Sequence, residues 1–253
     1  MRDDSPFSSG PDPAGQDVPP PEASVPVHTG LLVMVGVMVA IHGLQTLALA
    51  SVVSPLFLPN SVYGLLGFFG FRFDAWLAGE PYSIQLWWSF LTHALVHGSW
   101  LHLMMNCAIF LAIGHMIVRT MGIGVLLTVF LSSVIGGALV HGLIAGHQGV
   151  LIGASGGVFG QLGAMVVWRA IMLVRSGFSL GPIWRLLLGL IAMNLILAFA
   201  LSGGFGGGES GGTELAWEAH LGGFLAGALV ALFWQPRPMP SSQRRPRNQR
   251  TIL

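Results

Sequence analysis

The feature that most constrains this chain is the stretch from Thr120 to Trp168, which contains no charged side chain. A membrane-spanning helix needs about 20 predominantly apolar residues, so this stretch is too long for one span and predicts two. Over the whole chain 53% of the residues are hydrophobic and 8% are charged, whereas soluble domains carry about 25% charged residues. The composition therefore predicts an all-α integral membrane protein. The net charge of +1 gives no indication of nucleic-acid binding.

Six apolar segments are predicted to cross the membrane. They run over about 30–53, 100–118, 121–145, 155–167, 183–201 and 217–234. Between the first two, residues 54–98 form a long connection that is rich in aromatic side chains and carries few charges. This mixture is typical of short helices at the membrane interface. We therefore expect a six-helix membrane domain over residues 30–235, with a disordered tail over 1–29 and a basic tail over 236–253.

The arginines predict an orientation for these spans. Six alternating spans place both termini on one side of the membrane, and ten of the eleven arginines fall on that side. Only Arg72 falls on the other side, so the positive-inside rule predicts that both termini are cytoplasmic. The chain shows no mitochondrial-type leader, which favours a bacterial cytoplasmic (inner) membrane. Cys107 is the only cysteine, which excludes an intrachain disulfide.

A run of small residues surrounds one hydroxyl at the start of the fourth span. The run is Gly153-Ala154-Ser155-Gly156-Gly157. Glycines allow backbone N–H groups to approach a substrate closely, and the first turn of a helix offers unpaired donors and a partial positive charge. These properties suit a serine nucleophile and a developing oxyanion. The alternative is a packing face of small residues with Ser155 as a helix cap, and the run alone does not decide between them.

Three further polar residues are predicted to lie at the same depth as Ser155. His102 and Asn106 are four residues apart, so they share one face of the second span, and His220 lies near the start of the sixth. Serine needs an adjacent base, and an imidazole can take its proton and return it to the leaving amine. Asn106 cannot act as a base but can donate from its amide. His102 faces the same region, so we interpret this pair as the oxyanion site and His220 as the base. Gly223 and Gly227 follow on the sixth span and favour close helix approach.

Three motifs occur in order along the chain: Gly153-Ala154-Ser155-Gly156, His102-x-x-x-Asn106, and Ala219-His220-x-x-Gly223-x-x-x-Gly227. Together they resemble the signature motifs of the rhomboid family of intramembrane serine proteases, over about residues 30–235. The resemblance implies a six-helix bundle with a long membrane-associated first loop and a Ser155–His220 dyad without a carboxylate. It implies an oxyanion hole from His102, Asn106 and the Ser155 backbone N–H. It also implies an aromatic ring, Phe159, on the catalytic imidazole, and a capping loop over 202–213.

The predicted function is hydrolysis of peptide bonds in or near transmembrane segments of other membrane proteins. The expected partners are single-span or other transmembrane substrates and the lipid bilayer, without nucleic acid, metal or cofactor. A second hypothesis is a catalytically inactive relative that binds or escorts membrane proteins. A third is a metalloenzyme using His93, His97, His102 and His220, although the sequence contains no His-Glu-x-x-His helix. A transporter is a further possibility, but inverted repeats are not evident.

The remaining polar residues have less specific interpretations. Arg72 follows Phe71, where the family usually has a Trp-Arg pair, and it either anchors the first loop or lies among lipid headgroups. His93 and His97 either face a wet cavity or form hydrogen bonds within the first loop, and the second is favoured. The others are interpreted as satisfied core or interface residues (His42, His115, His141, His147), as part of the tail (His28), or as a carboxylate pointing away from His220 (Glu218).

Overall fold

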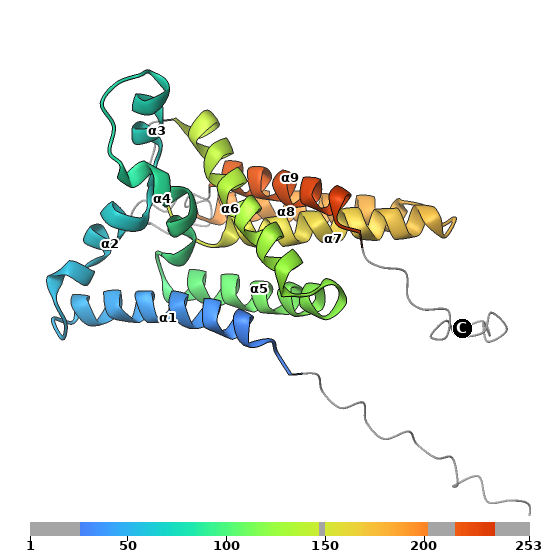
Figure 1. Cartoon of the computed structure of the whole chain (residues 1–253), viewed down its shortest axis with the longest axis horizontal. Coiled ribbons are helices and arrows are strands. Elements are labelled where there is room, and N and C mark those ends of the chain that lie inside the picture. The colour runs from blue at the N-terminus through green and yellow to red at the C-terminus, as the bar shows by residue number, and fades with distance from the viewer. Residues whose placement is uncertain (1–25, 147–149, 202–215, 236–253) are drawn as a thin grey trace, which may run out of the picture.

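The computed structural model describes residues 26–146, 150–201 and 216–235 (Figure 1). Most of that part of the chain is helical, and it contains six helices of 17 or more residues. They are α1 (Thr29–Leu49), α5 (Trp100–Met121), α6 (Ile123–Ala145), α7 (Ser155–Arg175), α8 (Gly181–Leu201) and α9 (Trp217–Phe233). Each corresponds to one of the predicted apolar segments. The first segment ends earlier than expected, because Ser51 has a positive φ of 59° and turns the chain.

Four of these helices, α1, α5, α6 and α7, are long and apolar enough to cross a membrane. Two shorter apolar stretches lie within α8 and α9, over Gly181–Ile196 and Trp217–Phe233. Large apolar side chains also cover much of the outside of the bundle, as with Leu188 on α8 and Leu229 on α9, which are 64% and 56% exposed. An outer surface of this kind is stable in lipid rather than in water. The chain is therefore a mostly helical, multi-pass membrane protein.

The helices form two groups joined by α6 (Figure 1). In the view of Figure 1, α1 lies beside α5, while α7, α8 and α9 form a second group, and α6 crosses obliquely between the two. Apolar side chains from α1, α5, α6 and α7 fill the space between them; Leu31, Phe110, Leu126 and Val129 are completely buried there. The start of α5, the end of α6 and the starts of α7 and α9 lie at one end of the bundle, called here the site end.

Where α9 meets α6 and α7, the helices touch through their backbones. We call six of the glycines at these contacts the glycine seam: Gly136 on α6, Gly156 and Gly160 on α7, and Gly222, Gly223 and Gly227 on α9. A Cβ added at Gly223 would collide with the carbonyl oxygen of Gly156, and one added at Gly227 would collide with that of Gly160. Small residues at such contacts let helices in membranes approach closely. The seam therefore sets how near α9 lies to the start of α7.

The first loop consists of short helices, as predicted, and one strand, which was not. Its elements are η2 (Pro55–Phe57), α2 (Pro59–Leu66), β1 (Phe68–Phe69), α3 (Gly70–Leu77), α4 (Gln85–Thr92) and η3 (His93–Leu95). Strand β1 pairs antiparallel with β2 (Val150–Leu151), and Phe68 lies opposite Leu151. This pairing ties the first loop to the segment that leads into α7, a contact between distant parts of the chain that local sequence patterns do not encode.

Arg72 anchors the first loop. Its guanidinium donates to the carbonyl oxygen of Gly64 (3.3 Å) and to the Gln85 side chain, and it lies over the Phe69 ring at 4.4 Å. Gln85 in turn donates to the carbonyl oxygens of Leu65 and Gly67 at 3.1 and 2.6 Å. These contacts support the interpretation of Arg72 as a loop anchor rather than as a side chain among lipid headgroups.

Helix α1 begins at Thr29, one residue before the predicted start of the membrane domain at residue 30. His28, assigned to the tail, is the N-cap of α1, and its Nδ1 accepts a hydrogen bond from the Gly30 N–H at 3.0 Å. An imidazole acceptor at this position satisfies one of the free N–H groups at the helix start. Most of the two predicted tails, His147 and the predicted capping loop over 202–213 lie outside the described residues.

Candidate active site

The segment that leads into α7 is held by two histidines of the first loop. The Gly153 N–H donates to the backbone carbonyl of His93 at 2.9 Å, and the Ala154 N–H donates to Nε2 of His97 at 3.4 Å. Gly153 has a φ of +113°, a conformation that residues with a Cβ rarely adopt. This turn delivers the chain to Ser155, the first residue of α7. We call the β1–β2 pair and these two histidine contacts the loop clamp.

His93 and His97 are neutral in this setting. Burial lowers the pKa of His93 to about 4, and burial, with smaller effects of His102 and His42, lowers the pKa of His97 to about 3. Nδ1 of His93 lies 2.8 Å from the carbonyl oxygen of Ser89, which favours a proton on that nitrogen. A neutral His97 can accept the Ala154 N–H on Nε2, whereas an imidazolium cannot. The His93 side chain forms its hydrogen bond within the first loop, the interpretation that the sequence favoured, whereas the His97 side chain accepts from Ala154 outside this loop.

The structure brings Ser155 and His220 into hydrogen-bond contact. Ser155 Oγ and His220 Nε2 are 2.9 Å apart, within the range of about 2.6–3.2 Å expected between a nucleophile and its base. His220 is 6% exposed and occupies the first turns of α9. Gly223, one turn further along α9, touches Gly156 next to the serine. The glycine seam therefore accounts for the short distance between these two side chains.

Two further residues contact the His220 ring. Phe159, one turn after Ser155 on α7, stacks on the imidazole with a centroid distance of 4.2 Å and an angle of 9° between the ring planes. Asn194 on α8 places its Oδ1 2.8 Å from His220 Nδ1. Sequence reasoning pointed to Phe159 through the family resemblance but missed Asn194. The available signal was that Asn194 is the one polar side chain after Arg185 in an otherwise apolar segment.

His102 and Asn106 also lie near the start of α7. The His102 ring packs against Gly153, with two ring atoms 2.8 Å from the place where a Cβ of Gly153 would be. His97 and His102 meet edge to face at 5.1 Å. The Asn106 amide nitrogen donates to the carbonyl oxygen of His102 at 2.9 Å, so one of its two N–H bonds is used within α5. The other N–H is left for a different acceptor.

Some histidines outside the candidate site have ring nitrogens without a hydrogen-bond partner among the described residues. His42 and His115 have a buried Nδ1 without a hydrogen-bond partner in the described part of the chain, and His141 lacks one at both nitrogens. His141 lies 3.6 Å from Glu218, an attraction between helices α6 and α9 that α6 alone does not reveal. Glu218 thus faces His141 rather than His220, in agreement with its predicted direction.

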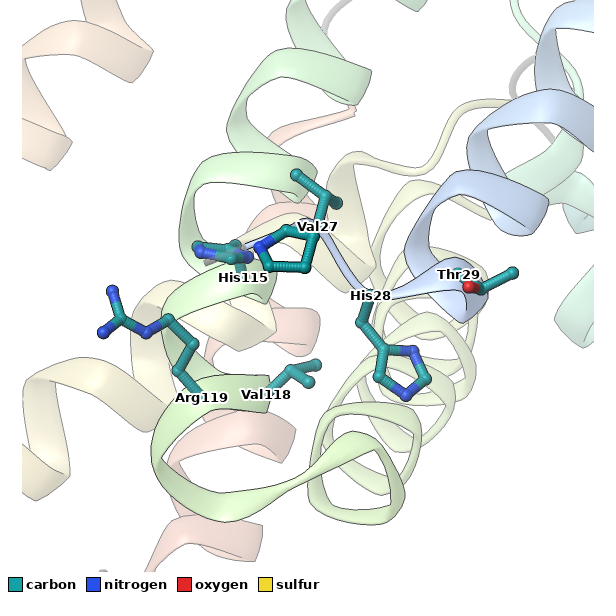
Figure 2. A pocket seen from close by; sticks show the side chains of 7 residues that line it. Val27, His28, Thr29, His115, Val118 and Arg119 are labelled. Carbon is teal, nitrogen blue, oxygen red and sulfur yellow. The ribbon is translucent and has the colours of Figure 1, made fainter. Parts of the chain in front are cut away.

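The hollow shown in Figure 2 is separate from Ser155, and the described residues contain no candidate metal cluster. Within residues 26–146, 150–201 and 216–235, no group of three His, Cys, Asp or Glu side chains could hold a metal ion. A hollow of about 400 Å³ is lined by His28, Thr29, His115, Val118 and Arg119, with Pro26 and Val27 (Figure 2). Arg119 lies near the end of α5 and His102 near its start, so at 1.5 Å per residue the hollow is about 25 Å from the site end.

The fold and the site define a class: multi-pass membrane proteins with a serine and a histidine paired near the ends of two helices. The rhomboid-domain family model matches residues 85–237 of this chain, which is more than half of it and runs from α4 to the end of α9. The chain belongs to the rhomboid family.

Three curated proteins are similar to more than half of this chain. The chain is 30% identical over 146 residues to the rhomboid protease GluP of Bacillus subtilis, covering 58% of this chain and 26% of that protein. It is 29% identical over 171 residues to the chloroplastic rhomboid-like protein 11 of Arabidopsis thaliana, covering 64% and 56%. It is 31% identical over 157 residues to RHOMBOID-like protein 5 of the same plant, covering 60% and 45%. The matches thus span between about a quarter and just over half of the relatives' length.

Proposed function

We propose that this protein is an intramembrane serine endopeptidase that cleaves other membrane proteins in or near their transmembrane segments, with Ser155 and His220 as a catalytic dyad. The observation that carries the proposal is the 2.9 Å contact between Ser155 Oγ and His220 Nε2. Membership of the rhomboid family and similarity to a rhomboid protease of Bacillus subtilis support it. The relative's activity belongs to that protein and is extended to this chain only as part of the proposal.

Catalysis begins when Ser155 attacks the carbonyl carbon of the scissile peptide bond. Its hydroxyl proton passes to Nε2 of His220, so the oxygen attacks as it becomes an alkoxide. The carbonyl oxygen gains negative charge in the tetrahedral intermediate. The N–H groups in the first turn of α7 have no partner within the helix, and with His102 and Asn106 they are the donors that stabilise this charge.

The intermediate collapses when the imidazolium gives its proton to the leaving amine. This leaves an ester between Ser155 and the carbonyl half of the substrate. His220 then removes a proton from a water molecule, which attacks the ester. The imidazolium returns this proton to Ser155 Oγ as the new carboxyl terminus leaves. A substrate helix must unwind locally before the first step, because the amide groups of a regular helix are buried in its own hydrogen bonds.

The proposal includes the arrangement in the membrane. Helices α1, α5, α6, α7, α8 and α9 are the six spans, the first loop lies along the interface, and residues 30–235 form the membrane domain. Both termini are cytoplasmic, the site end faces the outer side, and the membrane is a bacterial cytoplasmic membrane. The arginine distribution supports this orientation. Protease protection of epitope tags at the two ends, in sealed inside-out vesicles, tests it: both tags should be digested.

The test of activity uses the full chain in proteoliposomes. We expect cleavage of at least one member of a panel of single-span substrates, and covalent labelling of Ser155 by a fluorophosphonate. Ser155→Ala should abolish both while leaving the thermal unfolding temperature unchanged. Cleavage that survives Ser155→Ala would refute the dyad. Specific substrate binding without labelling of Ser155 would instead support the inactive binding or escort protein.

A further inference from the structure

The contact between Asn194 and His220 is not part of a serine–histidine dyad. Asn194 comes from α8, a helix that contributes no other residue to the candidate site, and its Oδ1 lies 2.8 Å from Nδ1 of His220. On the opposite side of the ring, Nε2 lies 2.9 Å from Ser155 Oγ. The three side chains therefore form a continuous line across α8, α9 and α7. Each end of the imidazole has one partner.

The second hydrogen bond of Asn194 fixes which end of its amide faces the histidine. The amide nitrogen donates to the carbonyl oxygen of Leu190, one turn earlier on α8, at 3.0 Å. A carbonyl oxygen can only accept, so this contact requires the nitrogen at that position. The amide oxygen is then the atom that faces His220. A flipped amide would oppose two oxygens at Leu190 and lose that bond.

The orientation of the amide determines which ring nitrogen carries the proton. Oδ1 of Asn194 is an acceptor, so the contact forms only when Nδ1 of His220 is protonated. In a neutral imidazole this leaves a lone pair on Nε2, where it can take the Ser155 hydroxyl proton. The other tautomer would place a lone pair on Nδ1 against the Asn194 oxygen and an N–H against Ser155. It could not act as the base.

The surroundings of α8 explain why an amide suits this position. Side chains on either side of Asn194 along α8 face outward, with Ile191 56% and Leu195 67% exposed, and they are apolar, as expected of a lipid-facing surface. A polar residue in such a helix is costly unless it has partners. The Asn194 amide has two, and it orients the ring without bringing a net charge into the membrane. A carboxylate would orient the ring equally well but would carry a large desolvation penalty.

We propose that Asn194 is a positioning residue of the active site: it holds His220 in the Nδ1-protonated tautomer and aims Nε2 at Ser155. This inference deepens the proposed function and rests on it for its catalytic meaning. It adds to the Ser–His dyad a third, neutral member on α8. Asn194 acts at two stages of the mechanism. It orients the neutral His220 before proton transfer, and its hydrogen bond strengthens when His220 becomes an imidazolium.

The first test measures cleavage kinetics of Asn194→Ala in proteoliposomes. We expect kcat to fall by about tenfold to a hundredfold, with KM changed by less than about twofold, because the lost hydrogen bond acts on the base and not on substrate binding. Leu195→Ala is the matched control, since it truncates the adjacent, lipid-facing residue of α8, and it should leave both constants unchanged. Wild-type kcat in Asn194→Ala would overturn the inference.

The second test uses Asn194→Asp, which restores an acceptor of the same shape but adds a negative charge. We expect kcat to recover relative to Asn194→Ala. The acid limb of the kcat/KM profile should move to higher pH by about half a unit or more, because a nearby carboxylate favours the protonated imidazole. A residue that merely stabilised the fold would not move this limb. An acid limb identical to that of the wild type in Asn194→Asp would overturn the inference.

The third test does not depend on activity. Nitrogen-15 spectra of histidine-labelled protein in lipid, with the His220 signal assigned by comparison with His220→Gln, report which ring nitrogen is protonated. We expect the Nδ1–H tautomer in the wild type and a mixture of tautomers in Asn194→Ala. If the wild type shows this tautomer but neither cleaves nor labels at Ser155, the proposed function fails while the positioning contact stands. If the wild type cleaves and Asn194→Ala keeps both its tautomer and its kcat, the positioning role fails alone.

Discussion

Ser155 is held from two directions by two kinds of structure. On the side of α9, the glycine seam brings α7 and α9 together through backbone contacts such as that of Gly156 with Gly223. On the side of the first loop, the loop clamp holds the approach to α7 through hydrogen bonds that the Gly153 and Ala154 N–H groups donate to the His93 carbonyl oxygen and to His97 Nε2. The seam contains no titratable group, while the clamp uses the backbone carbonyl of the buried His93 and the neutral imidazole of His97. The seam therefore sets the distance from Ser155 to His220, and the clamp holds the segment that leads into Ser155.

The largest effect is expected from adding a methyl group in the seam. Gly223→Ala places a Cβ against the carbonyl oxygen of Gly156, and only separation of α7 and α9 relieves that collision. We expect a loss of about 3 kcal/mol or more in the free energy of unfolding, at the upper end for overpacking, and loss of cleavage. Unfolding in lipid by steric trapping gives the first quantity. Gly189→Ala on α8 is the control, since nothing lies within 4 Å of its added Cβ, and a similar loss there would contradict the account of the seam.

A smaller effect is expected from the same change in the clamp. Gly153→Ala must adopt a φ of +113° and also presses against the His102 ring. A strained residue of this kind costs about 1–3 kcal/mol, and the displaced His102 and Ser155 should lower kcat. Thermal unfolding and cleavage assays measure the two effects. Gly79→Ala serves as a control because it shares a positive φ of 72° but has open space around it; its stability should fall while its activity is kept.

Acidification should weaken the loop clamp but not the glycine seam, because only the clamp contains histidines. His93 and His97 have folded pKa values of about 4 and about 3 against about 6.5 in an unfolded chain. Between these values the unfolded chain binds more protons, so stability is fully present above about pH 6.5 and falls as the pH drops toward 4. Unfolding measured from pH 8 to pH 4 should show this decline.

His97→Gln provides the control for that decline. Its side-chain oxygen can still accept the Ala154 N–H but does not titrate, so part of the acid sensitivity should disappear. An unchanged pH dependence in His97→Gln would show that the clamp is not the origin of the effect.

The smallest effect is expected from the anchor of the first loop. Arg72→Lys keeps the charge but loses the guanidinium nitrogen that donates to both Gly64 and Gln85, and the planar group that lies over Phe69. We expect a loss of about 1 kcal/mol in unfolding free energy and a change in cleavage of less than about threefold. Hydrogen exchange of the amides in α2 and α4 should increase, with those in α7 unchanged. Faster exchange in α7 as well would mean that the anchor also supports the clamp.

Much of the fold could be predicted because membrane-spanning helices require long apolar segments, which are visible in the sequence. The predicted starts at Trp100, Ser155 and Trp217 are also the starts of α5, α7 and α9, since charges and glycine-rich breaks mark where apolar runs end. The membership of the rhomboid family, predicted from three motifs, is confirmed by the match over residues 85–237. The strand pair β1–β2 could not be predicted, because two residues on each side carry no periodic signal.

In the candidate site, the residues could be predicted from the sequence, but several of their contacts could not. Ser155, His220, His102 and Asn106 could be named from residue chemistry and spacing, as each stands out as a polar group near the end of an apolar segment. The hydrogen bond within α5 that occupies one N–H of Asn106 was not foreseen, nor was the pairing of Glu218 with His141. Both depend on rotamers that packing selects.

What the sequence determined by itself was the number and place of the apolar segments and the identity of the candidate site residues, because hydrophobicity and chemical type are properties of single residues and their spacing. Only the tertiary structure decided which groups meet. The 2.9 Å contact of Ser155 with His220, the Asn194 oxygen behind that ring and the two histidines that hold Gly153 and Ala154 join residues that lie far apart along the chain. Their distances follow from how closely the helices pack, and that is set by backbone contact across the glycine seam.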